Sequence, residues 1–355
     1  MGTPQSRITR HRPGHRITSA RPIVTHQDTL WRAPSVTADD RGHGRRLPAA
    51  ARISASTRPR FGPPPGSHAI STDLSSPPLD PDTHVGAVSL TVADLDRSVA
   101  YYRDAIGLSV LTREGGSASL GTAGQPLVLL TEVSGAPRAS GHTGLFHLAL
   151  RVPRREDLAR WLLHAAQSQV PLSGMSDHFV SEAIYLQDPD DHGIEIYHDR
   201  PRALWEHRVA EMTTAALDVD DLVQELGDSP QPFEGMPDDT DMGHVHLRVR
   251  DIPETITFYR DVVGLDLMAT YGPHAAFLAT GGYHHVGANV WQSLGATAPP
   301  PGSACLQFAT LVVPTTHGRD ALLDRVANSG QDPEHNDLGP VIRDPAGNAL
   351  VISAG

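Results

Sequence analysis

The chain has 355 residues with a formal net charge of -12, and 39% of its residues are hydrophobic. No apolar run approaches the roughly 18 residues that a membrane-spanning helix needs, so we expect no membrane partner. Residues 1–61 contain twelve Arg and three acidic side chains, which leaves a charge of -21 on the remainder. An acidic body repels the phosphate backbone, so we expect no nucleic-acid partner.

The first 83 residues are rich in Arg, Pro, Ser and Gly and show no sustained apolar period. This composition predicts a disordered, dispensable extension over residues 1–83. Its Arg-rich, acid-poor character is also typical of organelle transit peptides, but it lacks the apolar segment of a secretory signal. The single cysteine, Cys305, cannot form an internal disulfide, which favours a cytoplasmic location. The chain contains no lysine, which excludes Schiff-base chemistry.

The remainder of the chain repeats itself. Residues 87–111 and residues 244–268 align at an offset of 157, and nine of the 25 aligned positions are identical. Each copy begins with an alternating strand and continues with an Asp that can cap a helix, Asp94 or Asp251. An amphipathic helix and several short strand-like runs follow, so each copy predicts a βαβββ module.

Two further segments have the same layout, in which an apolar strand precedes an amphipathic helix. The expected strands are 145–152 and 306–313, and the expected helices are 155–169 and 318–329. The sequence therefore predicts an α+β fold of four βαβββ modules in two paired halves, an N-terminal domain over 84–200 and a C-terminal domain over 243–355. Between them, the acidic residues 201–242 predict a linker or lid with one short helix.

One hairpin combines several polar groups. Residues 176–197 contain two strand-like runs around DPDDHG, a cluster that predicts a tight turn. The hairpin carries His178, Tyr185 and Glu195. Because side chains alternate along a strand, Glu195 points away from its two isoleucine neighbours and faces either solvent or a polar interior.

The internal repeat serves as a control for these polar residues. When equivalent modules are superposed, each polar residue lies opposite an apolar one. The pairs are His147 with Phe308, Tyr185 with Val341, Glu195 with Val351 and His244 with Ala87. The βαβββ architecture therefore does not require these four polar side chains, which favours a functional role for them.

The paired modules resemble the vicinal oxygen chelate superfamily of glyoxalases, bleomycin resistance proteins and dioxygenases, and within it the two-domain type I extradiol catechol 2,3-dioxygenases. The resemblance also rests on His244, seven residues before Asp251, and on the segment HFVSEAIYLQDPDDHGIE. The family pattern of His, apolar-Tyr, Asp-Pro and Glu is matched by His178, Ile184-Tyr185, Asp188-Pro189 and Glu195. The chain departs from the pattern at Asp191, where Gly or Pro is usual.

The resemblance implies a metal site with His147, His244 and Glu195 as protein ligands. Two imidazoles and one carboxylate form the facial triad that binds Fe(II) and leaves positions open for substrate and O2. Zn²⁺ is the rival ion, and Mn²⁺ or Ni²⁺ are further alternatives. His246 lies two residues from His244 on the same strand face, so it is the alternative ligand and otherwise a residue of the substrate pocket.

These ligands belong to the second and third modules, whereas familiar members of the family carry them in the third and fourth. The site must therefore form between the N-terminal and C-terminal halves, either within one chain or across a dimer interface. We expect a homo-oligomer, and neither half alone should hold metal.

The resemblance also implies roles for residues around the metal. His285 is the expected base, His178 the acid/base group, and Tyr185 a hydrogen-bond donor to a substrate oxygen. His284 and Asn289 are expected in the substrate pocket. The substrates would be O2 and a catechol or related dihydroxylated aromatic, including a hydroquinone.

Two other functions stay open. A metal-dependent isomerase or lyase of the glyoxalase type usually has a second Glu among four ligands, but Ala288 and Asn289 stand where that Glu is sought. A metal-free binding protein of the bleomycin-resistance type needs mainly apolar and aromatic pocket walls, which the His/His/Glu set disfavours. The sequence thus favours a dioxygenase.

Overall fold

The computed structural model describes residues 78–208, 211–281 and 285–355, so the expectation for residues 1–77 lies outside the described residues. The described part contains the four expected βαβββ modules. The elements of the first module are β1 (His84–Val92), α1 (Leu95–Tyr101), η1 (Tyr102–Ile106), β2 (Ser109–Glu114), β3 (Ser117–Thr122) and β4 (Gln125–Glu132). Those of the third are β10 (Asp241–Arg248), α4 (Ile252–Thr257), η4 (Phe258–Val263), β11 (Asp266–Tyr271), β12 (Ala275–Ala279) and β13 (Val286–Asn289).

The helices of these two modules begin and end in the same way. Asp94 caps α1 and Asp251 caps α4, and each carboxylate accepts a hydrogen bond from the backbone N–H three residues further on. Both helices end in a π-helical turn, η1 or η4. The turns are closed by Gly107 and Gly264, each with a φ of 97°, a left-handed conformation that favours glycine.

The second and fourth modules also match the expected layout, and their helices agree with the expected ranges to within two residues. The elements of the second module are β5 (Gly144–Arg151), α2 (Arg155–Gln167), β6 (Gly174–Asp177), β7 (Ser181–Gln187) and β8 (Gly193–Asp199). Those of the fourth are β14 (Leu306–Val313), α5 (Thr316–Asn328), β15 (Glu334–Asn336), β16 (Gly339–Arg343) and β17 (Ala349–Ala354).

The segment between the halves packs against the second module. It contains η2 (Arg202–Leu204), β9 (Ala215–Ala216) and the expected short helix, α3 (Val219–Gln224). β9 pairs antiparallel with β6 through Ser176 and Asp177, so the segment extends the sheet at its edge.

Each of the two curled sheets combines one module from either half. The first sheet has the order β15-β16-β17-β14-β1-β4-β3-β2 and contains the first and fourth modules. The second has the order β11-β12-β13-β10-β5-β8-β7-β6-β9 and contains the second and third modules. The central pairs, β1 with β14 and β10 with β5, are antiparallel. The second and third modules therefore pair within one chain, an alternative that the sequence left open.

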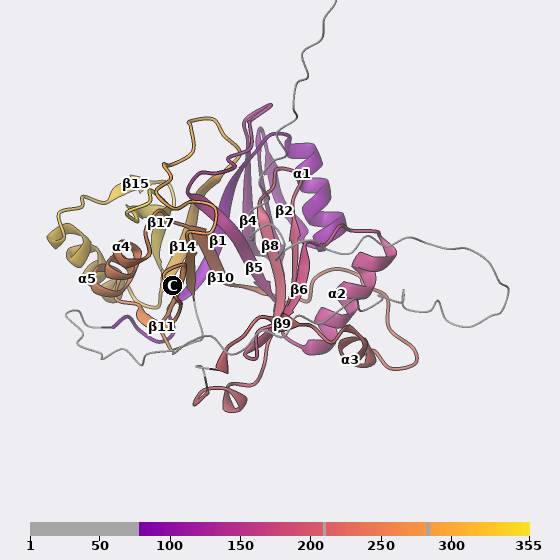
Figure 1. The fold of residues 1–355 in the computed structure, drawn as a ribbon. Helices are drawn as coiled ribbons and strands as arrows, with labels where there is room; N and C mark the ends of the chain where they lie inside the picture. Colours follow the sequence, from indigo (N-terminus) through magenta and orange to yellow (C-terminus); the bar gives the residue numbers. More distant parts are fainter. Residues whose placement is uncertain (1–77, 209–210, 282–284) are drawn as a thin grey trace, which may run out of the picture.

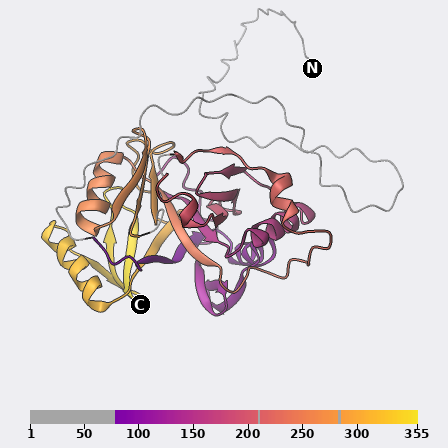
Figure 2. The ribbon, with the colours of Figure 1, turned by 90° about the horizontal axis from the view of Figure 1, so that it is seen from below.

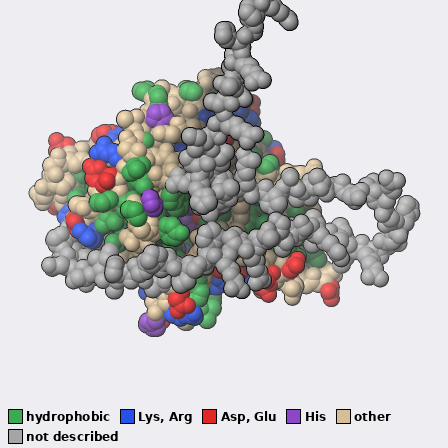
Figure 3. Space-filling view, in the orientation of Figure 1, with side chains coloured by type: hydrophobic (Ala, Val, Ile, Leu, Met, Phe, Trp, Pro, Cys, Tyr) green, Lys and Arg blue, Asp and Glu red, His purple; other side chains and the backbone are tan. Residues whose placement is uncertain are grey.

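Figure 1 shows the strands in the middle of the molecule, with α4 and α5 on one side and α1, α2 and α3 on the other. Seen from below, the C-terminal half in orange and yellow lies beside the N-terminal half (Figure 2). Acidic and basic side chains are interspersed with hydrophobic ones on the part of the surface that Figure 3 colours by side-chain type. No helix among the described residues is long and apolar enough to cross a membrane.

Residues 78–83 belong to the packed structure, although the sequence pattern assigned them to the extension. Leu79 is 6% exposed and joins the main hydrophobic core. Its backbone N–H donates to the carbonyl of Gly264 at 3.0 Å, and Thr280 Oγ1 donates to the carbonyl of Asp80 at 2.9 Å. The packed chain therefore begins before the expected boundary, because six residues are too few to show an apolar period.

Leu79→Ala is expected to lower the free energy of unfolding by about 2–4 kcal/mol, because it removes a buried side chain and leaves a cavity. Urea unfolding would measure this loss. The control is Leu338→Ala, since Leu338 is 54% exposed and its truncation should change stability by less than about 0.5 kcal/mol. Equal unfolding midpoints for the two variants would show that Leu79 does not stabilise the fold.

Candidate metal centre

Three neighbouring strands, β5, β8 and β10, bring polar side chains to one face of the second sheet. Alternate residues of these strands point into the hydrophobic core: Leu148, Ile194 and Val245. The residues next to them therefore point to the opposite face. These residues are His147, Glu195 and His244.

The three side chains converge. Glu195 Oε2 lies 2.9 Å from His147 Nε2 and 3.2 Å from His244 Nε2. The two Nε2 atoms are 3.3 Å apart. His147, Glu195 and His244 are 6%, 3% and 2% exposed, so water does not screen them.

Burial and charge set the protonation of this trio. Burial alone would raise the pKa of the Glu195 carboxyl, but the charges of His244 and His147 and their hydrogen bonds outweigh it and hold that pKa well below its usual range. Burial lowers the pKa of His147. An ionised carboxylate and a neutral imidazole are the states in which these groups bind metals.

The donor set fits a metal ion. Its three ligand atoms all lie within 4.8 Å of one another, and within the described ranges this is the one group of His, Cys, Asp or Glu atoms that meets this condition. Two imidazoles and one carboxylate suit Fe(II), Zn²⁺, Mn²⁺ or Ni²⁺ and leave coordination positions open.

Tyr185 and His178 lie beside the trio and are hydrogen-bonded to each other. Tyr185 is the strand partner of Glu195, and its ring centroid is 5.5 Å from that of His147. His178 Nδ1 donates to the carbonyl of Thr213 at 2.9 Å. In the neutral ring Nε2 is then an acceptor, and it lies 2.8 Å from Tyr185 Oη, which donates to it. The segment between the halves thus fixes the tautomer of His178.

The residue after His178 has an unusual backbone. Phe179 has a φ of 71°, which is rare for a bulky side chain. Its N–H donates to Asp177 Oδ1 at 2.8 Å, and the Arg208 guanidinium lies 4.6 Å from its ring centroid. These contacts hold a strained turn that sets the direction of the His178 side chain.

The departure from the family pattern at Asp191 leaves the turn of the hairpin intact. Asp191 has a φ of 68°, a conformation that favours glycine. Asp188 Oδ1 still accepts hydrogen bonds from the N–H groups of Asp190 at 2.8 Å and His192 at 2.9 Å.

His246 lies next to the trio without joining it. It is the strand partner of His147, and their ring centroids are 4.9 Å apart. The rings of Phe146 and Trp291 lie 5.2 and 5.7 Å from the His246 ring. His246 Nε2 is buried and has no hydrogen-bond partner among the residues described. This position suits a pocket residue.

The remaining candidates lie on β13 or just before it. Burial, followed by the charges of Arg151 and His244, lowers the pKa of His285 to about 4. His285 Nδ1 accepts from the N–H of Thr280 at 3.1 Å, so the neutral ring carries its proton on Nε2. Asn289 is fully buried. His284 lies outside the described residues.

Tyr197 is a neighbour of the trio that no sequence motif singled out. Its ring centroid lies 5.0 Å from that of His244. A Cβ on Gly243 would come within 1.9 Å of Tyr197 Oη, so the glycine makes room for the phenol. Tyr197 follows Glu195 by two residues, and strand alternation extended from Glu195 would have found it.

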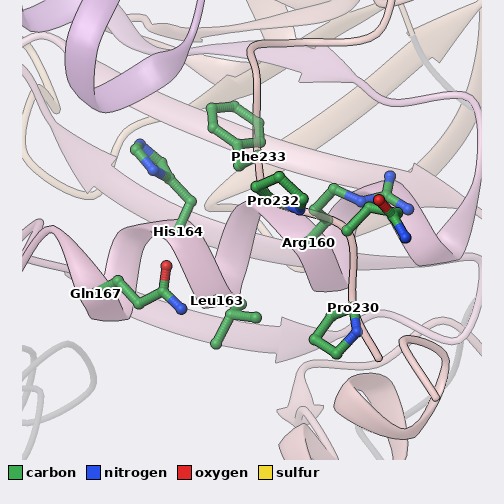
Figure 4. Close-up of a pocket in the computed structure, with 8 residues that line it drawn as sticks. Arg160, Leu163, His164, Gln167, Pro230, Pro232 and Phe233 are labelled. Atoms are coloured by element: carbon green, nitrogen blue, oxygen red, sulfur yellow. The ribbon is translucent and has the colours of Figure 1, made fainter. Parts of the chain in front are cut away.

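The surface has a cavity of about 220 Å³ elsewhere, between α2 and the segment that carries Pro230 and Phe233. Figure 4 shows its labelled side chains, and the Phe233 and His164 rings stack at 4.3 Å. None of its lining residues belongs to the trio, so it is no part of the candidate metal centre.

Comparisons with known proteins show the family of the chain. The model of the Glyoxalase/Bleomycin resistance protein/Dioxygenase superfamily matches residues 84–196 and 241–352. The chain is 37% identical over 280 residues to "Catechol-2,3-dioxygenase" of Bacillus subtilis (strain 168), which covers 76% of this chain and 96% of that protein.

Two solved structures share the fold. A crystal structure from Bacillus subtilis subsp. subtilis str. 168 has a TM-score of 0.54 at 13% identity and covers 76% of this chain and 84% of its own. Glyoxalase I from Zea mays has a TM-score of 0.50 at 18% identity and covers 76% of this chain and 92% of its own. The chain is thus an enzyme similar to catechol-2,3-dioxygenase, and it belongs to the Glyoxalase/Bleomycin resistance protein/Dioxygenase superfamily.

Proposed function

We propose that this protein is an Fe(II)-dependent extradiol dioxygenase that opens the ring of a catechol or a related dihydroxylated aromatic, such as a hydroquinone. The observation that carries the proposal is the convergence of His147, Glu195 and His244 within 4.8 Å of one another in a buried site. The similarity to "Catechol-2,3-dioxygenase" over most of the chain supports the same reaction class.

His147, His244 and Glu195 would hold the metal. When bound there, Fe(II) would lower the pKa of a catechol hydroxyl and activate O2. The single carboxylate gives the protein ligands a charge of -1, so a divalent ion leaves the centre with a positive charge that favours a deprotonated diol.

Tyr185 and His178 would handle the proton that the substrate releases. Tyr185 Oη donates to His178 Nε2, so the phenol can pass a proton to the imidazole and take one from a substrate hydroxyl. The imidazolium would be stabilised by its remaining Nδ1–H bond to the carbonyl of Thr213. This pair therefore serves as the base more readily than His285.

His285 suits a different role. Because its Nδ1 accepts from Thr280, only the Nε2–H of its neutral ring is left to interact with substrate. A pKa of about 4 keeps this ring neutral at pH 7. We therefore propose that His285 donates a hydrogen bond to an oxygen of the substrate.

An isomerase or lyase of the glyoxalase type is the competing function. In the described part of the chain, no second carboxylate joins the group of ligand atoms that lie within 4.8 Å of one another. At the end of β13, where such a carboxylate would be sought, the chain has Asn289. A metal held by three protein ligands has more open coordination positions than one held by four. This favours a reaction in which two substrates bind the same metal.

Anaerobic loading with Fe(II), followed by air and a panel of catechols and hydroquinones, tests the proposal. We expect O2 uptake together with a yellow ring-fission product. Iron-replete protein that consumes no O2 with any diol would refute the dioxygenase. Conversion of a hemithioacetal by Zn²⁺- or Ni²⁺-loaded protein would then establish the isomerase.

Removal of the metal is expected to lower the melting temperature by about 5–15 °C. A free metal concentration of 100 to 1,000 times Kd stabilises the native state by about 3–4 kcal/mol. Each kcal/mol raises the melting temperature of a large domain by about 2–4 °C. Melting curves with and without a chelator measure the shift. Glu195→Gln is the control, because its melting temperature should not respond to metal. A wild-type protein that is equally insensitive would argue against a metal between the two halves.

A further inference from the structure

Arg248 lies on the same sheet face as the metal trio and has no assigned role. On β10, Val245 and Leu247 point into the core, so His244, His246 and Arg248 share the opposite face. The strand partners of Arg248 are Gly144 on β5 and Asn289 on β13. Gly144 has no side chain, and a Cβ placed on it would meet no atom within 4 Å, so there is space next to Arg248 on this face of the sheet.

The charge of Arg248 is not neutralised by the described residues. Its Nε is buried without a hydrogen-bond partner, and burial lowers its pKa with no opposing effect from a carboxylate. Arg151, the other arginine on this face, differs because it pairs with Asp241 at 2.6 Å and Asp199 at 3.1 Å. A partly buried guanidinium without an acidic partner costs stability, and a bound ligand that supplies the negative charge would offset that cost.

Asn289 adds a second donor beside Arg248. Its Oδ1 accepts the N–H of Trp291 at 3.2 Å, which orients the amide. Its Nδ2 is then left as a donor, and that atom is buried without a partner among the residues described. Arg248 Nε and Asn289 Nδ2 are therefore two unsatisfied donors on paired residues of neighbouring strands. They match a group that only accepts hydrogen bonds, and a carboxylate with two oxygens is such a group.

We propose that Arg248 and Asn289 bind a carboxylate on the aromatic substrate, an inference that rests on the proposed dioxygenase function. Arg248 and its strand partner Gly144 lie two residues further along β10 than His246 and its partner His147. Two residues of a strand span about 7 Å, which is comparable with the distance from a diol oxygen to a substituent across one ring. The substrate class is therefore a catechol that carries an anionic substituent.

The test compares 3,4-dihydroxybenzoate with 4-methylcatechol, which has a methyl in place of the carboxylate. Arg248→Met should lower the ratio of their kcat/KM values about ten- to a hundred-fold, chiefly through KM, because it removes one charge-assisted contact. Arg248→Lys should recover part of the ratio, and Asn289→Ala should lower it less than Arg248→Met does. Arg250→Met is the matched control, since Arg250 lies beyond the strand and pairs with Glu254 at 3.0 Å.

Binding without turnover separates this inference from the proposed function. Calorimetry with metal-free protein and benzoate at fixed pH should show binding that Arg248→Met weakens about ten- to a hundred-fold and Arg250→Met leaves unchanged. The melting temperature of Arg248→Met should equal or exceed that of the wild type, which excludes a folding defect. If no diol is cleaved, the proposed function fails and the benzoate measurement still decides the subsite. An unchanged substrate ratio, or equal benzoate affinity in Arg248→Met, overturns the inference.

Discussion

Glu195→Gln is expected to reduce bound iron to background. Glu195 Oε2 lies within 3.2 Å of the Nε2 atoms of both His147 and His244, so it is the only negative charge between the proposed ligands. Glutamine keeps the shape but removes that charge, and a divalent ion would then have to replace its hydration shell with neutral donors alone. His147→Ala and His244→Ala should have the same result. Metal analysis of anaerobically loaded protein measures it.

His246→Ala is the control, because it truncates a neighbouring buried histidine outside the trio. It should retain a measurable metal content, since the His246 ring packs edge-on against the His147 ring without contributing a ligand atom. The opposite pattern, with an empty site in His246→Ala and a full one in His244→Ala, would exchange the roles of the two residues. Melting curves of all variants show whether metal loss has a cause other than unfolding.

His178→Gln is expected to slow turnover about 10²- to 10⁴-fold while iron occupancy stays at the wild-type level. That range is the usual value of general acid–base assistance. Tyr185→Phe removes the hydroxyl that links the substrate to His178 in the proposed proton path, so a loss of the same size, about 10²- to 10⁴-fold, is expected. Iron content, melting temperature and kcat are to be measured on the same preparations with a catechol substrate.

His335→Gln is the matched control for this series, because His335 is exposed on β15 of the fourth module. It should leave kcat, iron content and melting temperature unchanged. A purely structural role of the Tyr185–His178 pair would lower melting temperature and activity together. Full turnover by iron-replete His178→Gln would remove this pair from the mechanism.

The sequence predicted the modules, and it singled out the three residues that we propose as metal ligands, because both leave local signals. Asp94 and Asp251 cap equivalent helices, and the 157-residue offset shows them directly. His147 and Glu195 stood out because the repeat has apolar residues at the equivalent positions. In the structure, β5 and β8 pair so that both side chains lie on one face of the second sheet, 2.9 Å apart at their polar atoms.

Other features leave no signal in a single sequence. The pairing of β5 with β10 depends on which sheet edges meet, and no residue pattern specifies that choice. The carbonyl of Thr213 orients His178 from 35 residues away, and a backbone carbonyl looks the same at every position. Arg248 was missed because a lone arginine is common, and only its lack of a carboxylate in the described structure makes it unusual.

The strand pairing also sets an order of events during synthesis. Ser89 on β1 donates to Gln307 near the start of β14 at 2.8 Å, across 218 residues of chain. His147 and His244 are separated by only 97 residues. At a translation rate of about 5–20 residues per second, roughly 10–45 s pass between the synthesis of β1 and that of β14. The interval between β5 and β10 is roughly 5–20 s. The sheet that carries the proposed metal ligands can therefore close while the fourth module is still being translated, and β1 keeps an open edge that nascent-chain chaperones would have to shield.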